Sequence, residues 1–121
     1  MDSSRIFDMP FSKVFSLLAA KAERKGKTEE DVILLAAWLT GWSGDEIRGL
    51  CRSDITYGDF FRSAPHMNES RIRIRGKICS VDIASIEDPL MQDIRRFDKL
   101  VDELAKGKSA EAIIVKYTGN Q

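Results

Sequence analysis

Four cations spaced two residues apart are the side chains best suited to binding chemistry, namely Arg71, Arg73, Arg75 and Lys77. This alternation would place them on one face of a β-strand, as a basic strip able to contact a partner or phosphates. The more ordinary interpretation is a solvated face, or an edge strand that its charges protect from aggregation. Because we expect Asp82 opposite Arg71, part of the strip is neutralised, and the ordinary interpretation is favoured.

A second group of candidates lies in the segment 89–106, where Asp98 and Asp102 would share one side of a helix. Carboxylates in such a cluster can bind a divalent metal or transfer protons. However, Arg95 precedes Asp98 by three residues and Lys106 follows Asp102 by four, which are the spacings of ordinary ion pairs on a helix surface. We therefore interpret Arg95, Asp98 and Asp102 as a polar cluster, and predict neither a metal nor another cofactor.

The other reactive side chains are few and scattered. His66 is the only histidine and follows Pro65, so we expect it to be exposed in a loop. Cys51 and Cys79 fit no paired metal spacing, which is typical of two reduced thiols in the cytoplasm. The sequence has no phosphate-binding loop, dinucleotide fingerprint, metalloprotease helix or nucleophile elbow. No catalytic residue is assigned.

Composition restricts the function further. The 121 residues suffice for one domain and contain 19 basic and 19 acidic residues. With no net charge, nothing draws the whole protein to nucleic acid or to an anionic membrane. No secretory signal is visible at the start, and the longest apolar run falls far short of the roughly 20 residues that a membrane helix needs. We expect a cytoplasmic protein without membrane contact.

The uninterrupted apolar run 32–39 is the element around which we expect the chain to fold. Thr28 is a suitable N-cap, three acids follow it, and Gly41 can adopt the left-handed conformation that ends a helix. A helix that is apolar on every side must be covered on every side, by the chain or by a partner. Around it, the apolar spacing and capping residues such as Ser43 and Asp88 predict helices over 10–25, 45–52, 56–63 and 89–106.

The segment 70–83 alternates apolar and polar residues and predicts a β-hairpin. With Gly76-Lys77 as a two-residue turn, Ile72 would pair with Val81 on an apolar face, and Arg71 with Asp82 on the polar one. The apolar face should pack on the helices, because an isolated hairpin is marginally stable.

The two chain ends are expected to be less regular than the centre. We interpret residues 1–8 as a lead-in and residues 118–121 as a frayed tail. Ser109 could cap a helix over 110–117, but three consecutive β-branched residues at 113–115 leave a strand as the alternative.

Several blocks of sequence together resemble one bacterial protein family. They are residues 21–28, 38–41, 60–61 with 64–65 and Asn68, 87–91, and 94–95 with 98–108. Together they cover nearly the whole chain and resemble the prokaryotic domain-of-unknown-function family 2200. The resemblance implies a small cytosolic bacterial protein with no assigned activity or catalytic residues. The family tends to carry charged residues in the second helix, where this chain has Ile33, Leu34 and Ala37. This departure implies extra apolar surface, which we interpret as a subunit contact.

We therefore predict an α+β domain over residues 1–121, mostly helical, with five to six helices packed against one two-stranded antiparallel hairpin. The leading hypothesis for function is an interaction or regulatory module without catalytic activity, as a homodimer formed through the excess apolar helix surface. The first alternative is a nucleic-acid-binding protein that uses the basic hairpin 71–77, which is not favoured. The second is a small enzyme that uses the carboxylates of the long helix.

Overall fold

The structure is a computed structural model that describes residues 4–119 of the chain. Within these residues the α-helices are α1 (Ser4–Phe7), α2 (Phe11–Glu23), α3 (Glu29–Thr40), α4 (Gly44–Cys51), α5 (Tyr57–Arg62), α6 (Pro89–Ala105) and α7 (Ala110–Thr118). The 3₁₀ helices η1 (Glu69–Arg73) and η2 (Ile83–Ser85) flank a two-stranded antiparallel hairpin of β1 (Lys77–Ile78) and β2 (Val81–Asp82). The predicted fold class, mostly helical α+β with one hairpin, is confirmed.

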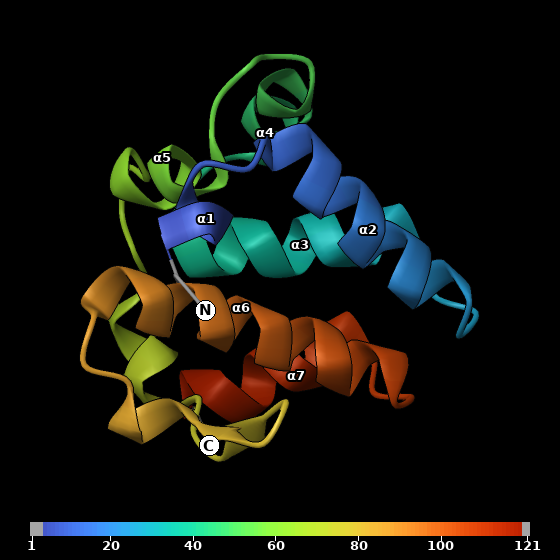
Figure 1. The fold of residues 1–121 in the computed structure, drawn as a ribbon. Helices are drawn as coiled ribbons and strands as arrows, with labels where there is room; N and C mark the ends of the chain where they lie inside the picture. The colour runs from blue at the N-terminus through green and yellow to red at the C-terminus, as the bar shows by residue number, and fades with distance from the viewer. Residues whose placement is uncertain (1–3, 120–121) are drawn as a thin grey trace.

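Helix α3 lies in the middle of the fold and contacts α2, α4, α6 and α7 (Figure 1). Its two ends are those predicted. The Thr28 hydroxyl accepts a hydrogen bond from the Asp31 N–H at 3.2 Å, and Gly41 closes the helix with a φ of +83°. Most of its apolar residues are buried, including Val32, Leu35, Ala36 and Leu39. The cover that we expected on every side is incomplete, because 38% of Leu34 is exposed.

The other capping residues also form hydrogen bonds with backbone groups only a few residues away. The side chains of Ser43, Asp88 and Ser109 each accept a backbone N–H from the first turn of α4, α6 and α7. Residues 110–117 are therefore helical. Ile113 and Tyr117, four residues apart, are both buried, and this burial outweighs the modest cost of β-branched residues in a helix.

Both chain ends are more regular than expected. Instead of an irregular lead-in, residues 4–7 form α1, which contacts α5. Phe7 anchors it there, half-buried against the hydrophobic core. At the other end α7 includes Thr118, and Gly119 follows it in the left-handed conformation. The remaining parts of the predicted lead-in and tail, residues 1–3 and 120–121, lie outside the described residues.

The hairpin exists, but its predicted register is wrong. The turn lies at Cys79-Ser80, both with positive φ (53° and 68°), as a two-residue turn between twisted strands requires. Each strand is two residues long, and Lys77 lies opposite Asp82. The predicted turn at Gly76-Lys77 would instead have placed Arg71 opposite Asp82.

The first predicted strand is instead a 3₁₀ helix, η1, because the local hydrogen bonds favour a turn. The Asn68 side chain accepts a hydrogen bond from the Ser70 N–H at 2.8 Å, which caps this turn. The segment then packs on α7. The alternation of apolar residues is not obeyed, since Ile74 is buried whereas 62% of Ile72 is exposed.

An aromatic cluster joins α2, α5 and α6 in the core. The rings of Phe11 and Phe60 stack with centroids 4.1 Å apart, and Tyr57 meets Phe61 edge-on at 5.2 Å. Phe61 in turn contacts Phe97 of α6 at 6.4 Å. This cluster holds α2 on one side of α3 and leaves the opposite helix, α7, to be fixed by other contacts.

Candidate functional site

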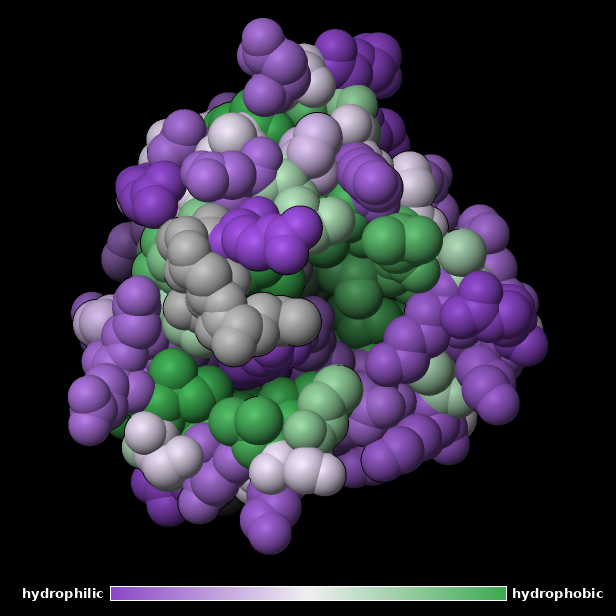
Figure 2. All heavy atoms as spheres, viewed as in Figure 1, coloured by the Kyte–Doolittle hydropathy of each residue, from purple (hydrophilic) through white to green (hydrophobic). Residues whose placement is uncertain are grey.

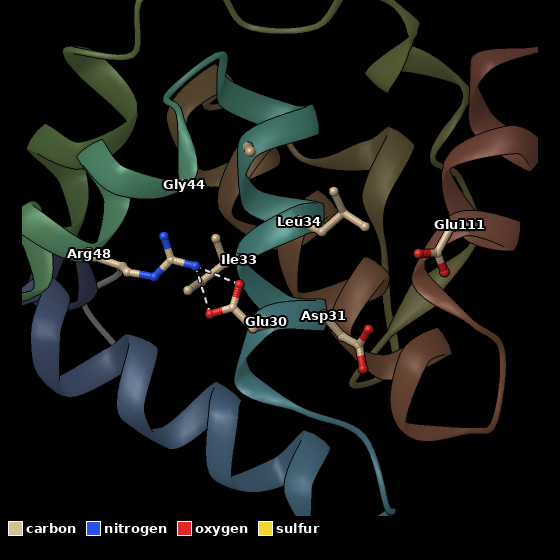
Figure 3. Close-up of a pocket in the computed structure, with 8 residues that line it drawn as sticks. Glu30, Asp31, Ile33, Leu34, Gly44, Arg48 and Glu111 are labelled. Carbon is tan, nitrogen blue, oxygen red and sulfur yellow. Dashed lines mark hydrogen bonds and ion pairs between the residues drawn. The ribbon is translucent and has the colours of Figure 1, made fainter.

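A hollow between α3, α4 and α7 is the surface feature best suited to binding (Figure 3). We call it the groove, and it is lined by Glu30, Asp31, Ile33, Leu34, Ala37, Gly44, Arg48 and Glu111. Three of these residues, Ile33, Leu34 and Ala37, form an apolar floor on α3. Figure 3 shows Leu34 and Glu111 pointing toward each other from α3 and α7.

The apolar floor consists of residues that stand out in the sequence as unusually apolar for a helix surface. We expected extra apolar surface at Ile33, Leu34 and Ala37, and the structure brings all three together in the groove. Leu34 is exposed, Ala37 is half-buried, and Ile33 is buried at 4% exposure. Together they form a small apolar surface at one place, and not a broad apolar face.

The rim of the groove is acidic. Three carboxylates, Glu30, Asp31 and Glu111, face a single cation, Arg48, so the lining carries two net negative charges (three minus one). Both Arg48 Nη2 contacts go to the Glu30 carboxylate, at 2.5 and 2.7 Å. The hydrogen bond to Glu30 is the main reason that the pKa of Arg48 is raised. Asp31 is used in the cap of α3, which leaves the Glu111 charge directed into the groove.

Helix α7, which carries Glu111, is held in place by a buried carboxylate on α6. Glu103 is 6% exposed and accepts hydrogen bonds from the Tyr117 hydroxyl, and from Lys108 and Lys116 at 3.1 Å each. Burial alone would raise the pKa of Glu103, but these three donors together lower it below its usual value. The pKa of Tyr117 is raised by burial and by its bond to the carboxylate. This network was not predicted from the sequence, because the partners lie up to 14 residues from Glu103.

The predicted polar cluster of α6 is made of ion pairs. Arg95 donates to Asp98 at 2.9 Å and Lys106 contacts Asp102 at 3.0 Å, which confirms the two predicted pairings. Lys21 of α2 adds a third contact, to Asp102 at 3.4 Å. Burial raises the pKa of Asp98, and the neighbouring Arg95 partly opposes this effect.

Beneath this cluster lies a buried hydroxyl. The Tyr57 hydroxyl has no hydrogen-bond partner within the described residues, 4–119. Burial raises the pKa of Tyr57 well above its ordinary value, and the negative charge of Asp98 adds to the effect. Tyr57 is therefore protonated at neutral pH, and its ring serves the aromatic core.

The four cations of the predicted basic strip do not share one face. Arg71 lies on η1 and donates to Asp93 of α6 at 2.8 Å, instead of pairing with Asp82. Arg73 lies against Gly119 at the end of α7. Arg75 and Arg73 border a shallow hollow with Ile72, whereas Lys77 is in β1. Since the strand that was to align these side chains is absent, phosphate contact along a strand face has no geometric support.

The residues of other reactive types lie apart from the groove. His66 is exposed in a loop, as predicted, and its backbone N–H donates to the Thr40 carbonyl at 3.1 Å. Cys51 is partly buried, which raises the pKa of its thiol, and Cys79 is exposed in the hairpin turn. Within the described part of the chain, no group of three His, Cys, Asp or Glu side chains could hold a metal ion. Likewise, none of the described helices is long and apolar enough to cross a membrane.

Comparisons with known proteins agree with the fold. No curated protein matches the chain. A crystal structure of the uncharacterised protein SP1917 superposes with a TM-score of 0.96, at 48% sequence identity. The similarity covers 99% of this chain and 98% of that one. A family model described as an uncharacterised protein conserved in bacteria, domain of unknown function 2200, matches residues 5–115. Because that match spans almost the entire sequence, the chain belongs to this family of uncharacterised bacterial proteins.

Proposed function

We propose that this protein is an interaction module without catalytic activity, and that it acts in the cytoplasm. Its groove binds a partner segment in which an apolar side chain lies between basic residues. The observation that carries this proposal is the exposure of Leu34 beside an acidic rim, in the apolar run 32–39 whose other residues are buried or half-buried. Chemically, the floor favours an aliphatic side chain, and the rim favours flanking lysine or arginine residues.

The expected affinity is modest, because the groove is small. Covering the exposed 38% of Leu34 would contribute about 1 kcal/mol, and burying a leucine of the partner about 2 kcal/mol. Rim ion pairs at an exposed site add about 0.2–1 kcal/mol each. These terms sum to about 3–5 kcal/mol before the cost of association is subtracted, so binding should be no tighter than about 10⁻⁴ M, and it should weaken with added salt.

A pair of synthetic peptides tests the proposal directly. One is a 12-residue amphipathic helix of leucine, alanine and lysine, and the other has glutamate in place of each lysine. Titrated into ¹⁵N-labelled protein, the lysine peptide should shift the amide resonances of residues 30–37 and of Glu111, and the glutamate peptide should not. Equal shifts with both peptides, or shifts that avoid these residues, would contradict the proposal.

Matched variants separate groove binding from general stickiness. Leu34→Glu places a charge on the floor and should remove the response to the lysine peptide. Ile72→Glu alters a side chain that is more exposed, at 62%, and lies on η1 outside the groove lining, so the response should persist. Loss of binding in both variants would show that the peptide binds without regard to the groove.

A further inference from the structure

We propose that the segment bound in the groove is the outer face of α2 from a second copy of this chain, so that the protein self-associates head to tail. This inference rests on the proposed function of the groove. It specifies one partner for the groove, namely a surface found on the protein itself.

The outer face of α2 combines an exposed leucine with two cations. Lys13, Leu17, Ala20 and Arg24 follow one another at intervals of four, three and four residues, which places them along one side of the helix. Lys13 and Arg24 are exposed, and 59% of Leu17 is exposed. Figure 2 faces α2 and shows hydrophobic residues at the surface beside it, among hydrophilic ones.

The charge on this outer face is opposite to the net charge of the groove. In the groove, an exposed leucine lies beside carboxylates with a net charge of minus two. On α2, the exposed Leu17 lies about one helical turn after Lys13 and about two turns before Arg24. Docking would place Leu17 against Leu34, with Arg24 near the Glu111 carboxylate, which points into the groove. An ion pair then lies beside a single apolar contact, which favours this pairing over non-specific association.

Charge also argues against the symmetric alternatives. Two grooves facing each other would bring the carboxylates of Asp31 and Glu111 together with their own copies. Two α2 faces would bring lysine and arginine against their own copies. A two-fold interface uses the same surface on both subunits, so each arrangement would be repulsive.

A head-to-tail contact has a consequence that a two-fold dimer lacks. The groove is lined by residues of α3, α4 and α7, so each copy offers one groove and one separate α2 face. An interface of this kind continues from copy to copy until it closes into a ring. Association should therefore pass beyond the dimer, unlike the homodimer predicted from the sequence.

Sedimentation velocity of the full chain at low ionic strength tests this inference. The mass should rise above the 13.7 kDa of one chain as concentration increases, and pass 27 kDa, about twice that value. Leu17→Glu and Leu34→Glu should each shift the association to at least tenfold higher concentration. The control Ile72→Glu should leave it within threefold of the wild type.

Mixing the two variants provides the decisive result. Leu17→Glu retains its groove and Leu34→Glu retains its α2 face, so an equimolar mixture should form a one-to-one dimer that neither variant forms alone. This complementation also shows that both variants are folded. A two-fold dimer built from two grooves or from two α2 faces would give no such recovery. A dimer of the wild type that the mixture of variants fails to restore would overturn the inference.

The charges provide an independent check. Arg24→Glu and Glu111→Lys should each weaken the association about two- to tenfold, and the two variants mixed should recover part of it, because the swapped charges again attract. A chain that stays at 13.7 kDa at millimolar concentration, while its groove still binds the lysine peptide, refutes self-association and leaves the proposed function intact. If neither peptide binding nor association occurs, both proposals fail.

Discussion

Replacing Glu103 with glutamine should destabilise the protein by about 2–3 kcal/mol. The carboxylate is almost fully buried and accepts three hydrogen bonds, one of them from the Tyr117 hydroxyl. A hydrogen bond to a buried charged group contributes about 1.5–3 kcal/mol, against about 1 kcal/mol for a neutral one. Lys108 and Lys116 are each 48% exposed, so solvent screens both ion pairs and we assign the effect mainly to the hydrogen bond from Tyr117.

Urea unfolding followed by circular dichroism measures this loss. Glu103→Gln should lower the midpoint without changing the slope, and lower the melting temperature by roughly 6–12 °C. Glu87→Gln, on an exposed carboxylate just before α6, is the control and should change the unfolding free energy by less than about 0.5 kcal/mol. Equal effects of the two substitutions would refute the assignment of Glu103 as the residue that holds α7.

The stability difference between the wild type and Glu103→Gln should depend on pH. Because the folded-state pKa of Glu103 lies below its ordinary value of 4.5, the carboxylate stabilises the fold fully above that value. The contribution is lost as the pH falls through the lowered folded-state pKa. The stability difference between wild type and Glu103→Gln should therefore shrink below about pH 4.5, when melting temperatures are compared between pH 7 and pH 2.5. A difference independent of pH would contradict an ionic role.

Four further substitutions test other parts of the structure. Tyr57→Phe should leave the unfolding free energy unchanged or raise it by up to about 1 kcal/mol, because the hydroxyl is buried without a partner in residues 4–119; a loss above that amount in urea would reveal a partner. Asp98→Asn should gain stability relative to the wild type as the pH rises from 3 to 7, since a raised folded-state pKa disfavours the ionised carboxyl in the fold; thermal melts that diverge in the opposite direction would reverse this sign. Gly41→Ala should cost about 2 kcal/mol or more, because its φ is +83° and the new Cβ would lie 2.8 Å from the His66 carbonyl oxygen. Gly49→Ala, which meets open space in α4, should instead be neutral or stabilising by about 0.5–1 kcal/mol in the same assay.

The groove could be anticipated only in part. The sequence identified Ile33, Leu34 and Ala37 as unusual, and predicted that the apolar run containing them needs cover. It did not indicate that Glu111, more than 70 positions away, would face them across the gap to α7. Arg48 enters the rim through its ion pair with Glu30, 18 residues earlier, which no helical spacing predicts.

Local chemistry was sufficient to identify where four of the helices begin. Thr28, Ser43, Asp88 and Ser109 accept hydrogen bonds from backbone groups two or three residues away, so their effect does not depend on the rest of the fold. Gly41 ends α3 for an equally local reason, its access to positive φ. The amphipathic stripe of α6 is likewise visible in sequence.

Only the tertiary structure decided the register of the hairpin and the partners of the buried charges. Alternation over residues 70–83 is compatible with a longer hairpin, but Asn68 caps a turn and Arg71 reaches Asp93 on α6. Glu103 likewise finds Tyr117 through the packing of α7. A cap is decided by neighbours along the chain, whereas a strand register and a buried ion pair depend on which distant surfaces meet. Those surfaces are brought together by the burial of apolar side chains, which has no preferred direction and no fixed spacing in the sequence.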